Sequence, residues 1–219
     1  MTVFSNVLFD LDGTLLNTGE GITESISNTL RELGLPALSQ EALLSFVGPP
    51  LQTSFMRHCA CDESAAQHAA TVFRGYYSSG AMFKASPYEG IYTLCDRLLA
   101  AGVRMGVATY KKEDLAVKVL ERFSFPKYCG SIHGADAENR RKKEDVIRLC
   151  LEELHAAPQD CLYVGDTAGD AAAAEKAGVP FLAVSYGFGF KTEDDVSPWP
   201  HIGIVNTPLE IADYVLGRE

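Results

Sequence analysis

Two aspartates stand two positions apart near the start of the chain, in the segment Phe9-Asp10-Leu11-Asp12-Gly13-Thr14. A second acidic segment, Val164-Gly165-Asp166-Thr167-Ala168-Gly169-Asp170, lies much further along the chain. Because Mg²⁺ prefers carboxylate and carbonyl oxygens with water, we expect Asp10, Asp166 and the backbone carbonyl of Asp12 to bind this ion. Phosphoryl transfer requires the charge on the phosphate oxygens to be offset while the attacking and leaving oxygens stay in line. The two acidic segments therefore predict a magnesium-dependent site for phosphate chemistry.

Short apolar segments precede the polar residues and predict the strands that position them. Val7-Leu8-Phe9 comes directly before Asp10, and a predicted strand at 103–108 comes directly before Thr109. Buried parallel strands have this continuous apolar character. Right-handed crossovers gather the carboxyl ends of such strands along one edge of the sheet, where open α/β sheets bind their ligands. We therefore expect the acids and Thr109 to meet at that edge.

The order of the elements predicts the fold class. Strands and helices alternate in the second part of the chain, which favours βαβ units and a parallel sheet. Further strands are expected at three segments: 161–164, 181–184 and 202–205. Between residues 17 and 83 the sequence has only helical segments, rich in Ala, Ser and Leu. We expect a doubly wound, Rossmann-like α/β core of residues 1–16 and 84–219, with a small α-helical domain inserted at 17–83.

Composition and charge exclude several classes of partner. The 219 residues have a formal net charge of -10, whereas nucleic acid and anionic membrane surfaces attract clustered Lys and Arg. The N-terminal segment Met1-Thr2-Val3-Phe4-Ser5-Asn6 has no basic region, and no apolar run is long enough to cross a bilayer. The six cysteines lack a Cys-x-x-Cys spacing, which favours reduced thiols. We expect a cytoplasmic monomer or small homo-oligomer that binds a small phosphorylated metabolite, without nucleic acid or membrane partners.

A lysine at the start of a helix completes the predicted site. Lys142 and Lys143 both stand at the start of the helix that contains Ile147, and either ammonium could balance the charge on the nucleophile and the phosphate. Thr109 has a simpler alternative role, as the N-cap of the helix that begins near Lys112.

These features together resemble the haloacid dehalogenase superfamily of phosphatases. The resemblance rests on Asp10-Leu11-Asp12-Gly13-Thr14, the strand-terminal Thr109, the helix-starting lysine, and Gly165-Asp166 with Asp170. It covers nearly the whole chain, and the Asp-x-Asp-Gly-Thr motif close to the N-terminus is highly specific. The resemblance implies a Rossmann-like core with an inserted cap, and Mg²⁺ as the cofactor.

The resemblance also implies a role for each matching residue. Asp10 would be the nucleophile that forms a phospho-aspartyl intermediate, and Asp12 the general acid and base. Thr109 would hold a phosphoryl oxygen and Asp166 the metal, while Asp170 would be a further ligand or would support one. The dehalogenases themselves lack an acid at the position of Asp12, so a phosphatase is favoured over a dehalogenase.

The inserted helical segment resembles the cap of the phosphoglycolate phosphatase-like group. Its landmarks are Phe46-Val47-Gly48-Pro49-Pro50-Leu51 and Pro87-Tyr88-Glu89-Gly90, and the resemblance implies that the Gly48-Pro49 loop faces the active site and recognises the leaving group. Two positions depart from the family pattern: Tyr110 stands where Asn usually follows the threonine, and Asn17 where an acid is common.

The catalytic lysine often precedes proline in this group, and this chain has Arg140-Arg141-Lys142-Lys143-Glu144-Asp145-Val146-Ile147 instead. Lys143 is preferred because its spacing to Val146-Ile147 resembles a proline-free variant, although Lys142 stays open.

The expected activity is hydrolysis of a small phosphomonoester, with phosphoglycolate, a sugar phosphate or a nucleotide as candidate substrates. A phosphosugar mutase on the same scaffold is one alternative. A catalytically silent phosphate-binding protein is the other, and the intact pair of Asp10 and Asp12 argues against it, because a binding module needs no general acid.

Overall fold

The computed structural model describes residues 3–138 and 140–217. The chain folds into two compact units, one made of Met1–Leu16 with Pro87–Glu219 and the other of Asn17–Ser86. The second unit extends three residues beyond the expected boundary at residue 83. The N–H of Gly21 donates to the carbonyl of Lys84, and the Lys84 ammonium pairs with the Glu24 carboxylate, so the segment after residue 83 stays attached to the first helix of that unit.

The first unit is built on a parallel sheet. Within the described residues the sheet has six strands, and they are β1 (Asn6–Phe9), β4 (Arg104–Lys112), β5 (Cys129–Ala135), β6 (Cys161–Gly165), β7 (Phe181–Val184) and β8 (Ile204–Val205). All five strand pairs are parallel. Two further short strands, β2 (Leu16–Asn17) and β3 (Ser86–Pro87), form a separate pair.

The strand order β5-β4-β1-β6-β7-β8 makes this a doubly wound sheet. The chain runs outward from β1 through β4 to β5, and then returns to the other side of β1 to continue through β6, β7 and β8. The order therefore reverses between β1 and β6, which is the position where open α/β sheets bind ligands at the carboxyl ends of their strands. The fold class predicted from the sequence is confirmed.

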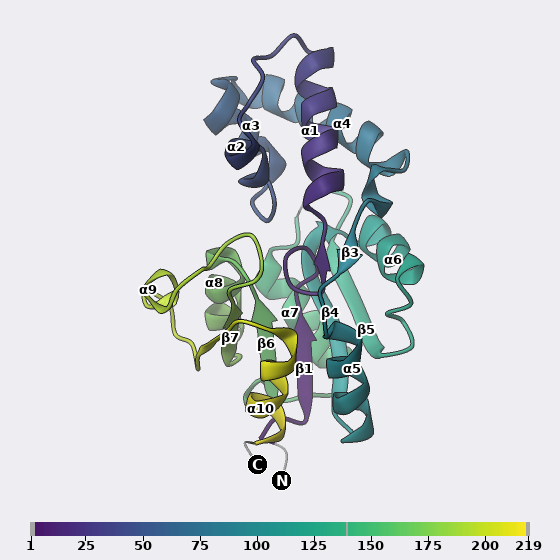
Figure 1. Ribbon diagram of the computed structural model, residues 1–219, viewed down its shortest axis with the longest axis vertical. Coiled ribbons are helices and arrows are strands. Elements are labelled where there is room, and N and C mark those ends of the chain that lie inside the picture. The colour runs from purple at the N-terminus through teal and green to yellow at the C-terminus, as the bar shows by residue number, and fades with distance from the viewer. Residues whose placement is uncertain (1–2, 139, 218–219) are drawn as a thin grey trace. The chain divides into compact units, whose positions relative to one another are not determined.

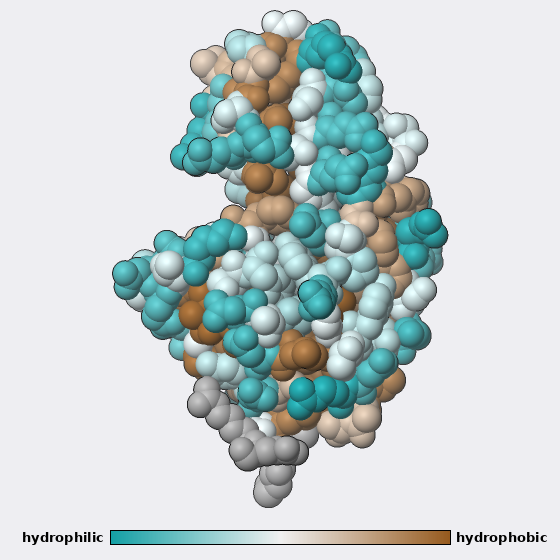
Figure 2. Space-filling view, viewed as in Figure 1, coloured by the Kyte–Doolittle hydropathy of each residue, from teal (hydrophilic) through white to brown (hydrophobic). Residues whose placement is uncertain are grey.

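Helices cover both faces of the sheet, with α5 and α10 in front of it in Figure 1 and α7 behind. The helices of this unit are α5 (Ile91–Ala100), α6 (Glu113–Arg122), α7 (Lys143–Glu153), α8 (Ala168–Ala177), α9 (Glu193–Val196) and α10 (Ile211–Leu216), with 3-10 turns η2 (Pro158–Asp160) and η3 (Pro208–Glu210). One continuous core joins α7 and α8 to the sheet through buried residues such as Ile147, Ala171 and Tyr163. The visible face in Figure 2 is mainly hydrophilic, with hydrophobic residues in separate spots.

The second unit is helical, as the sequence predicted. Its elements are α1 (Gly19–Glu32), α2 (Gln40–Leu44), α3 (Leu51–Cys59), α4 (Glu63–Ser78) and the 3-10 turn η1 (Ala81–Phe83). Helix α1 packs on α4, and α4 on α3, around buried residues such as Ile26 and Phe55. In the segment before α3, the Phe46 ring packs edge-on against Phe55 and stacks on His58, with ring centroids 5.1 and 5.2 Å apart.

The sheet differs from the prediction at β4 and β5. Strand β5 was not predicted, because its Gly, Ser and His residues interrupt the apolar pattern of a strand at the edge of the sheet. Strand β4 was expected to end at Ala108 but continues to Lys112, with an irregular register against β5 between these two residues. Irregularities of this kind redirect side chains, and this one lies in the part of β4 that contains Thr109.

None of the helices in the described ranges is long and apolar enough to span a membrane. The six cysteines are free thiols.

Helix α7 carries Lys143, so its packing matters for the site. Ile147 is fully buried in the core under the sheet, and Ile147→Ala is expected to lower the free energy of unfolding by about 2–5 kcal/mol because it leaves a cavity. Leu99→Ala is the matched control, since Leu99 is 52% exposed and its loss should cost less than about 0.5 kcal/mol. Urea unfolding of both variants measures the difference, and equal stabilities would contradict this account of the core.

Candidate active site

Asp10 lies immediately after β1, at the position where the strand order reverses. Its N–H donates to the carbonyl of Val164 in β6, 2.9 Å away, so the backbone of the two central strands fixes its place. The chain then turns back, with the N–H of Gly13 donating to the carbonyl of Leu16 at 2.8 Å. Gly13 has a φ of 90°, and a Cβ there would lie 2.3 Å from Oδ2 of Asp166. Only glycine allows the turn and the close approach of the second acid at once.

Asp166 lies directly after β6 and is held by a loop that follows β7. Its Oδ2 accepts hydrogen bonds from the N–H groups of Phe188 and Gly189, at 2.7 and 3.2 Å. A Cβ on Gly187 would lie 2.4 Å from the Asp166 side chain, so this loop packs directly against the acid. The other oxygen, Oδ1 of Asp166, is buried and has no hydrogen-bond partner among the residues that the structure describes.

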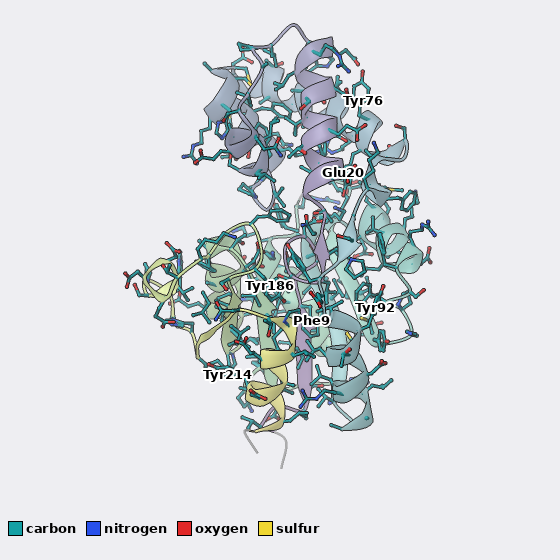
Figure 3. All side chains as sticks on the ribbon, viewed as in Figure 1. Phe9, Glu20, Tyr76, Tyr92, Tyr186 and Tyr214 are labelled. Atoms are coloured by element: carbon teal, nitrogen blue, oxygen red, sulfur yellow. The ribbon has the colours of Figure 1, made fainter. Side chains whose placement is uncertain are left out.

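The same loop also contacts the turn after β1. The hydroxyl of Tyr186 donates to the carbonyl of Thr14 at 3.1 Å, and Figure 3 shows Tyr186 near the end of β1, which Phe9 marks. Residues 186–189 were not among the predicted site residues. The available signal was their position directly after a strand whose carboxyl end lies at the same edge of the sheet.

The structure distinguishes between the two candidate lysines. The ammonium of Lys143 lies 3.0 Å from Oδ1 of Asp10, and it also pairs with Oδ1 of Asp170. Its side chain is only 14% exposed. Lys142 is the N-cap residue of α7 and is exposed. Lys143 therefore enters the acidic site while Lys142 remains at the surface, because successive residues at a helix start point in different directions.

Asp170 supports the site from the first turn of α8. Its Oδ2 accepts from the N–H of Thr167 at 2.9 Å and from the hydroxyl of the same residue, which closes a capping box at the start of the helix. Its Oδ1 accepts from the buried hydroxyl of Tyr163 at 3.0 Å and pairs with Lys143. Both oxygens are therefore engaged within the protein, which favours a supporting role for Asp170 over a place among the metal ligands.

Asp12 faces a different partner. Both of its carboxylate oxygens lie 3.0 Å from the ammonium of Lys111, near the end of β4. Thr109 is buried on the same strand, and its hydroxyl accepts from the N–H of Lys111 at 3.3 Å. Helix α6 begins at Glu113 with no side-chain cap, so Thr109 does not serve as its N-cap. Lys111 was not among the predicted site residues, although it stands two residues after Thr109, which was.

Burial and mutual repulsion raise the pKa values of two acids of the site strongly. Burial raises the pKa of Asp10 to about 6; Lys143 opposes the rise, while Asp170 and Asp12 add to it. Burial also raises the pKa of Asp166 to about 8, with contributions from Asp170 and Asp10, against the lowering effect of the two N–H donors. Burial disfavours the charged form of Lys143, but Asp10 and Asp170 outweigh it and raise its pKa.

The acids fit a divalent cation. Ligand atoms of Asp10, Asp166 and Asp170 lie within 4.8 Å of one another. Because both oxygens of Asp170 already have partners, Asp10 and Asp166 are the carboxylates suited to an ion, and the unpartnered Oδ1 of Asp166 is a buried polar atom that a cation would satisfy. Oxygen donors of this kind suit Mg²⁺.

Comparison with known proteins shows the family. A model described as haloacid dehalogenase-like hydrolase matches residues 7–184. A phosphatase of Clostridium acetobutylicum, described as predicted, has a crystal structure that superposes with a TM-score of 0.88 at 35% identity, covering 96% of this chain and 97% of the other. The chain belongs to the haloacid dehalogenase-like hydrolases, as its motifs predicted.

Relatives of this chain have names that state different activities. A 5'-nucleotidase of Pseudomonas aeruginosa is 34% identical over 87% of this chain and 86% of its own length. A phosphoglycolate phosphatase of Rhodospirillum rubrum is 33% identical over 83% of this chain and 80% of its own length. A tyrosine-protein kinase, PtkA, of Mycobacterium tuberculosis is 34% identical over 84% of this chain, which spans 62% of that protein.

The raised pKa values predict how pH affects cation binding. Between about pH 4 and 8 the folded protein without a cation holds more protons on Asp10 and Asp166 than the unfolded chain does, so these acids make it less stable as pH rises. Mg²⁺ competes with those protons. The increase in Tm that MgCl2 causes, relative to EDTA, should therefore be larger at pH 8 than at pH 6.

Thermal unfolding at both pH values measures this effect. In Asp166→Asn the increase in Tm caused by MgCl2 should be lost at both pH values, because the variant removes the carboxylate whose buried Oδ1 we expect to bind the cation. A wild-type increase of the same size at pH 6 and pH 8 would contradict proton competition.

Proposed function

We propose that this protein is a magnesium-dependent phosphatase that hydrolyses small phosphomonoesters through a phospho-aspartyl intermediate on Asp10. One observation carries the proposal. Asp10 lies at the switch point of the sheet, with Lys143 on one oxygen. Beside it lies an Asp166 oxygen that has no hydrogen-bond partner in the described ranges of the chain. A carboxylate suited to nucleophilic attack, an ammonium that balances its charge and a carboxylate oxygen available to a ligand thus lie together at the edge where such sheets bind ligands.

The proposed reaction has two steps. In the first, a carboxylate oxygen of Asp10 forms a bond to phosphorus while the bond to the leaving oxygen breaks, and Asp12 gives that oxygen a proton. In the second, Asp12 takes a proton from water, whose oxygen attacks phosphorus and releases Asp10 with inorganic phosphate. Covalent catalysis of this kind divides one difficult hydrolysis into two easier displacements.

The other site residues offset charge. Lys143 contacts the nucleophile directly, so its ammonium reduces the repulsion between the Asp10 carboxylate and an approaching phosphate. Thr109 would donate its hydroxyl to a phosphoryl oxygen, and its position after the part of β4 that pairs with the end of β1 supports this role. Mg²⁺, when bound by Asp10 and Asp166, supplies further positive charge for the phosphate oxygens.

The names of relatives support a small phosphorylated substrate. Both a 5'-nucleotidase and a phosphoglycolate phosphatase are similar to this chain over most of its length, and the site fits the phosphoryl group that their substrates share. The cap role of Asn17–Ser86, the cytoplasmic location and the oligomeric state stay predictions.

Two alternative activities differ from hydrolysis in where the phosphoryl group goes. A phosphosugar mutase would return it to a sugar and depend on a bisphosphate activator, with little free phosphate. A relative named as a tyrosine kinase adds transfer to a protein hydroxyl as a further possibility. Release of inorganic phosphate in the absence of any acceptor separates hydrolysis from both.

The central test compares wild type with Asp10→Asn on a panel of esters that includes phosphoglycolate and nucleoside 5′-monophosphates. Phosphate release by the wild type should require Mg²⁺ and stop with EDTA, and the variant should be reduced to background because an amide cannot form the intermediate. Activity that survives the substitution or the chelator would overturn the proposed mechanism. The same panel ranks the substrates.

The two adjacent lysines form a matched pair. Lys143→Met should lower kcat/KM by at least about 10²-fold, because it removes the charge that faces the nucleophile and the phosphate. Lys142→Met should change it by less than about twofold, because an exposed surface charge contributes little. Equal losses in the two variants would show that the contact of Lys143 with Asp10 has no part in catalysis.

A further inference from the structure

Lys111 forms an ion pair with Asp12 that neither the motifs nor the proposed mechanism uses. Its ammonium lies 3.0 Å from each oxygen of the Asp12 carboxylate. The Lys111 side chain is 7% exposed and that of Asp12 is 14% exposed, so the pair is shielded from water. A contact to both oxygens restrains the position of a carboxylate more tightly than a contact to one oxygen would.

The backbone that carries Lys111 is itself held in place. It lies in the irregular stretch at the end of β4, between Ala108 and Lys112. A Cβ on Gly134 of β5 would lie 2.5 Å from the carbonyl oxygen of Lys111, so the two backbones approach as closely as glycine permits. The first residue of α6, Glu113, accepts a hydrogen bond from the N–H of Gly134 at 3.1 Å. These contacts anchor the strand end from the β5 side.

Each aspartate of the Asp-x-Asp motif thus has its own lysine. Lys143 contacts the nucleophile Asp10, and Lys111 contacts Asp12. The next lysine, Lys112, has a different role, since its ammonium donates to the backbone carbonyls of Asp136 and Ala137. Lys111 and Lys112 are successive residues of β4, and successive side chains of a strand point to opposite faces, so Lys111 contacts Asp12 while Lys112 contacts the loop after β5.

We propose that Lys111 is a positioning residue that orients Asp12 for proton transfer to the leaving oxygen. The inference rests on the proposed phosphatase function. When Asp12 is ionised, the ammonium holds both oxygens. When one oxygen carries the proton, the ammonium retains the other, so the carboxyl group keeps its direction while the proton moves to the leaving oxygen and the P–O bond breaks.

This role makes a specific kinetic prediction. A proton donor matters most when the leaving oxygen is a poor leaving group, and little when it is a good one. Phenyl phosphate and p-nitrophenyl phosphate have similar shapes, but phenolate is the poorer leaving group. The parameter kcat/KM covers the steps through formation of the phospho-aspartate, so it isolates the step in which the leaving oxygen is protonated.

In Lys111→Met we expect kcat/KM to fall by about 10²-fold for phenyl phosphate and by less than about tenfold for p-nitrophenyl phosphate. A lysine needed only for folding would lower both by the same factor. Lys111→Arg keeps a donor with two N–H groups toward one carboxylate. It should therefore restore part of the activity on phenyl phosphate relative to p-nitrophenyl phosphate. In an Asp12→Asn background, Lys111→Met should leave the ratio of the two esters unchanged.

The matched control is Lys112→Met, which should leave the ratio of the two esters at the wild-type value. Equal losses on both esters in Lys111→Met, with the wild-type ratio kept, would overturn the positioning role while leaving the proposed function intact. A change in the ratio of the two esters when Lys111→Met is added to Asp12→Asn would also overturn the positioning role. A wild type that hydrolyses neither ester nor any other phosphomonoester with Mg²⁺ would overturn the proposed function, and this inference with it.

Discussion

The rest of this site depends on one constraint, which is that several carboxylates are buried close together and repel one another. Asp10, Asp12, Asp166 and Asp170 converge at one edge of the sheet, and two of them have strongly raised pKa values because burial and neighbouring acids disfavour their charge. Two lysines enter the same site. Four carboxylates and two ammonium groups leave two negative charges when all are ionised, which is the charge that one divalent cation balances.

The fold supplies these compensating contacts from several separate segments. Asp170 is held by the first turn of α8 and by the Tyr163 hydroxyl from the sheet. It pairs with Lys143, which also contacts Asp10 at the end of β1. The loop after β7 donates two N–H groups to one oxygen of Asp166. Because the supporting contacts take specific oxygens, they decide which oxygens remain for an ion or a substrate.

The paired arrangement of lysines gives the two neighbouring aspartates different surroundings. Asp10 is buried among acids with one ammonium on a single oxygen, whereas Asp12 is held by an ammonium across both oxygens. A nucleophile and a proton-transfer group need such a difference, since one must attack phosphorus and the other must exchange protons. Lys111, which lies in the irregular end of β4, makes the contact that distinguishes Asp12 from Asp10.

The sequence by itself determined the sheet class, the inserted helical segment and the acids at the strand ends, because buried parallel strands leave continuous apolar runs and the chemistry-bearing residues follow them directly. Only the tertiary structure decided which of Lys142 and Lys143 contacts Asp10, since both lie at a helix start and differ in direction rather than in pattern. It also revealed Lys111 and the Phe188 and Gly189 amides. Those contacts join segments far apart in the chain, and no local periodicity encodes which of them meet.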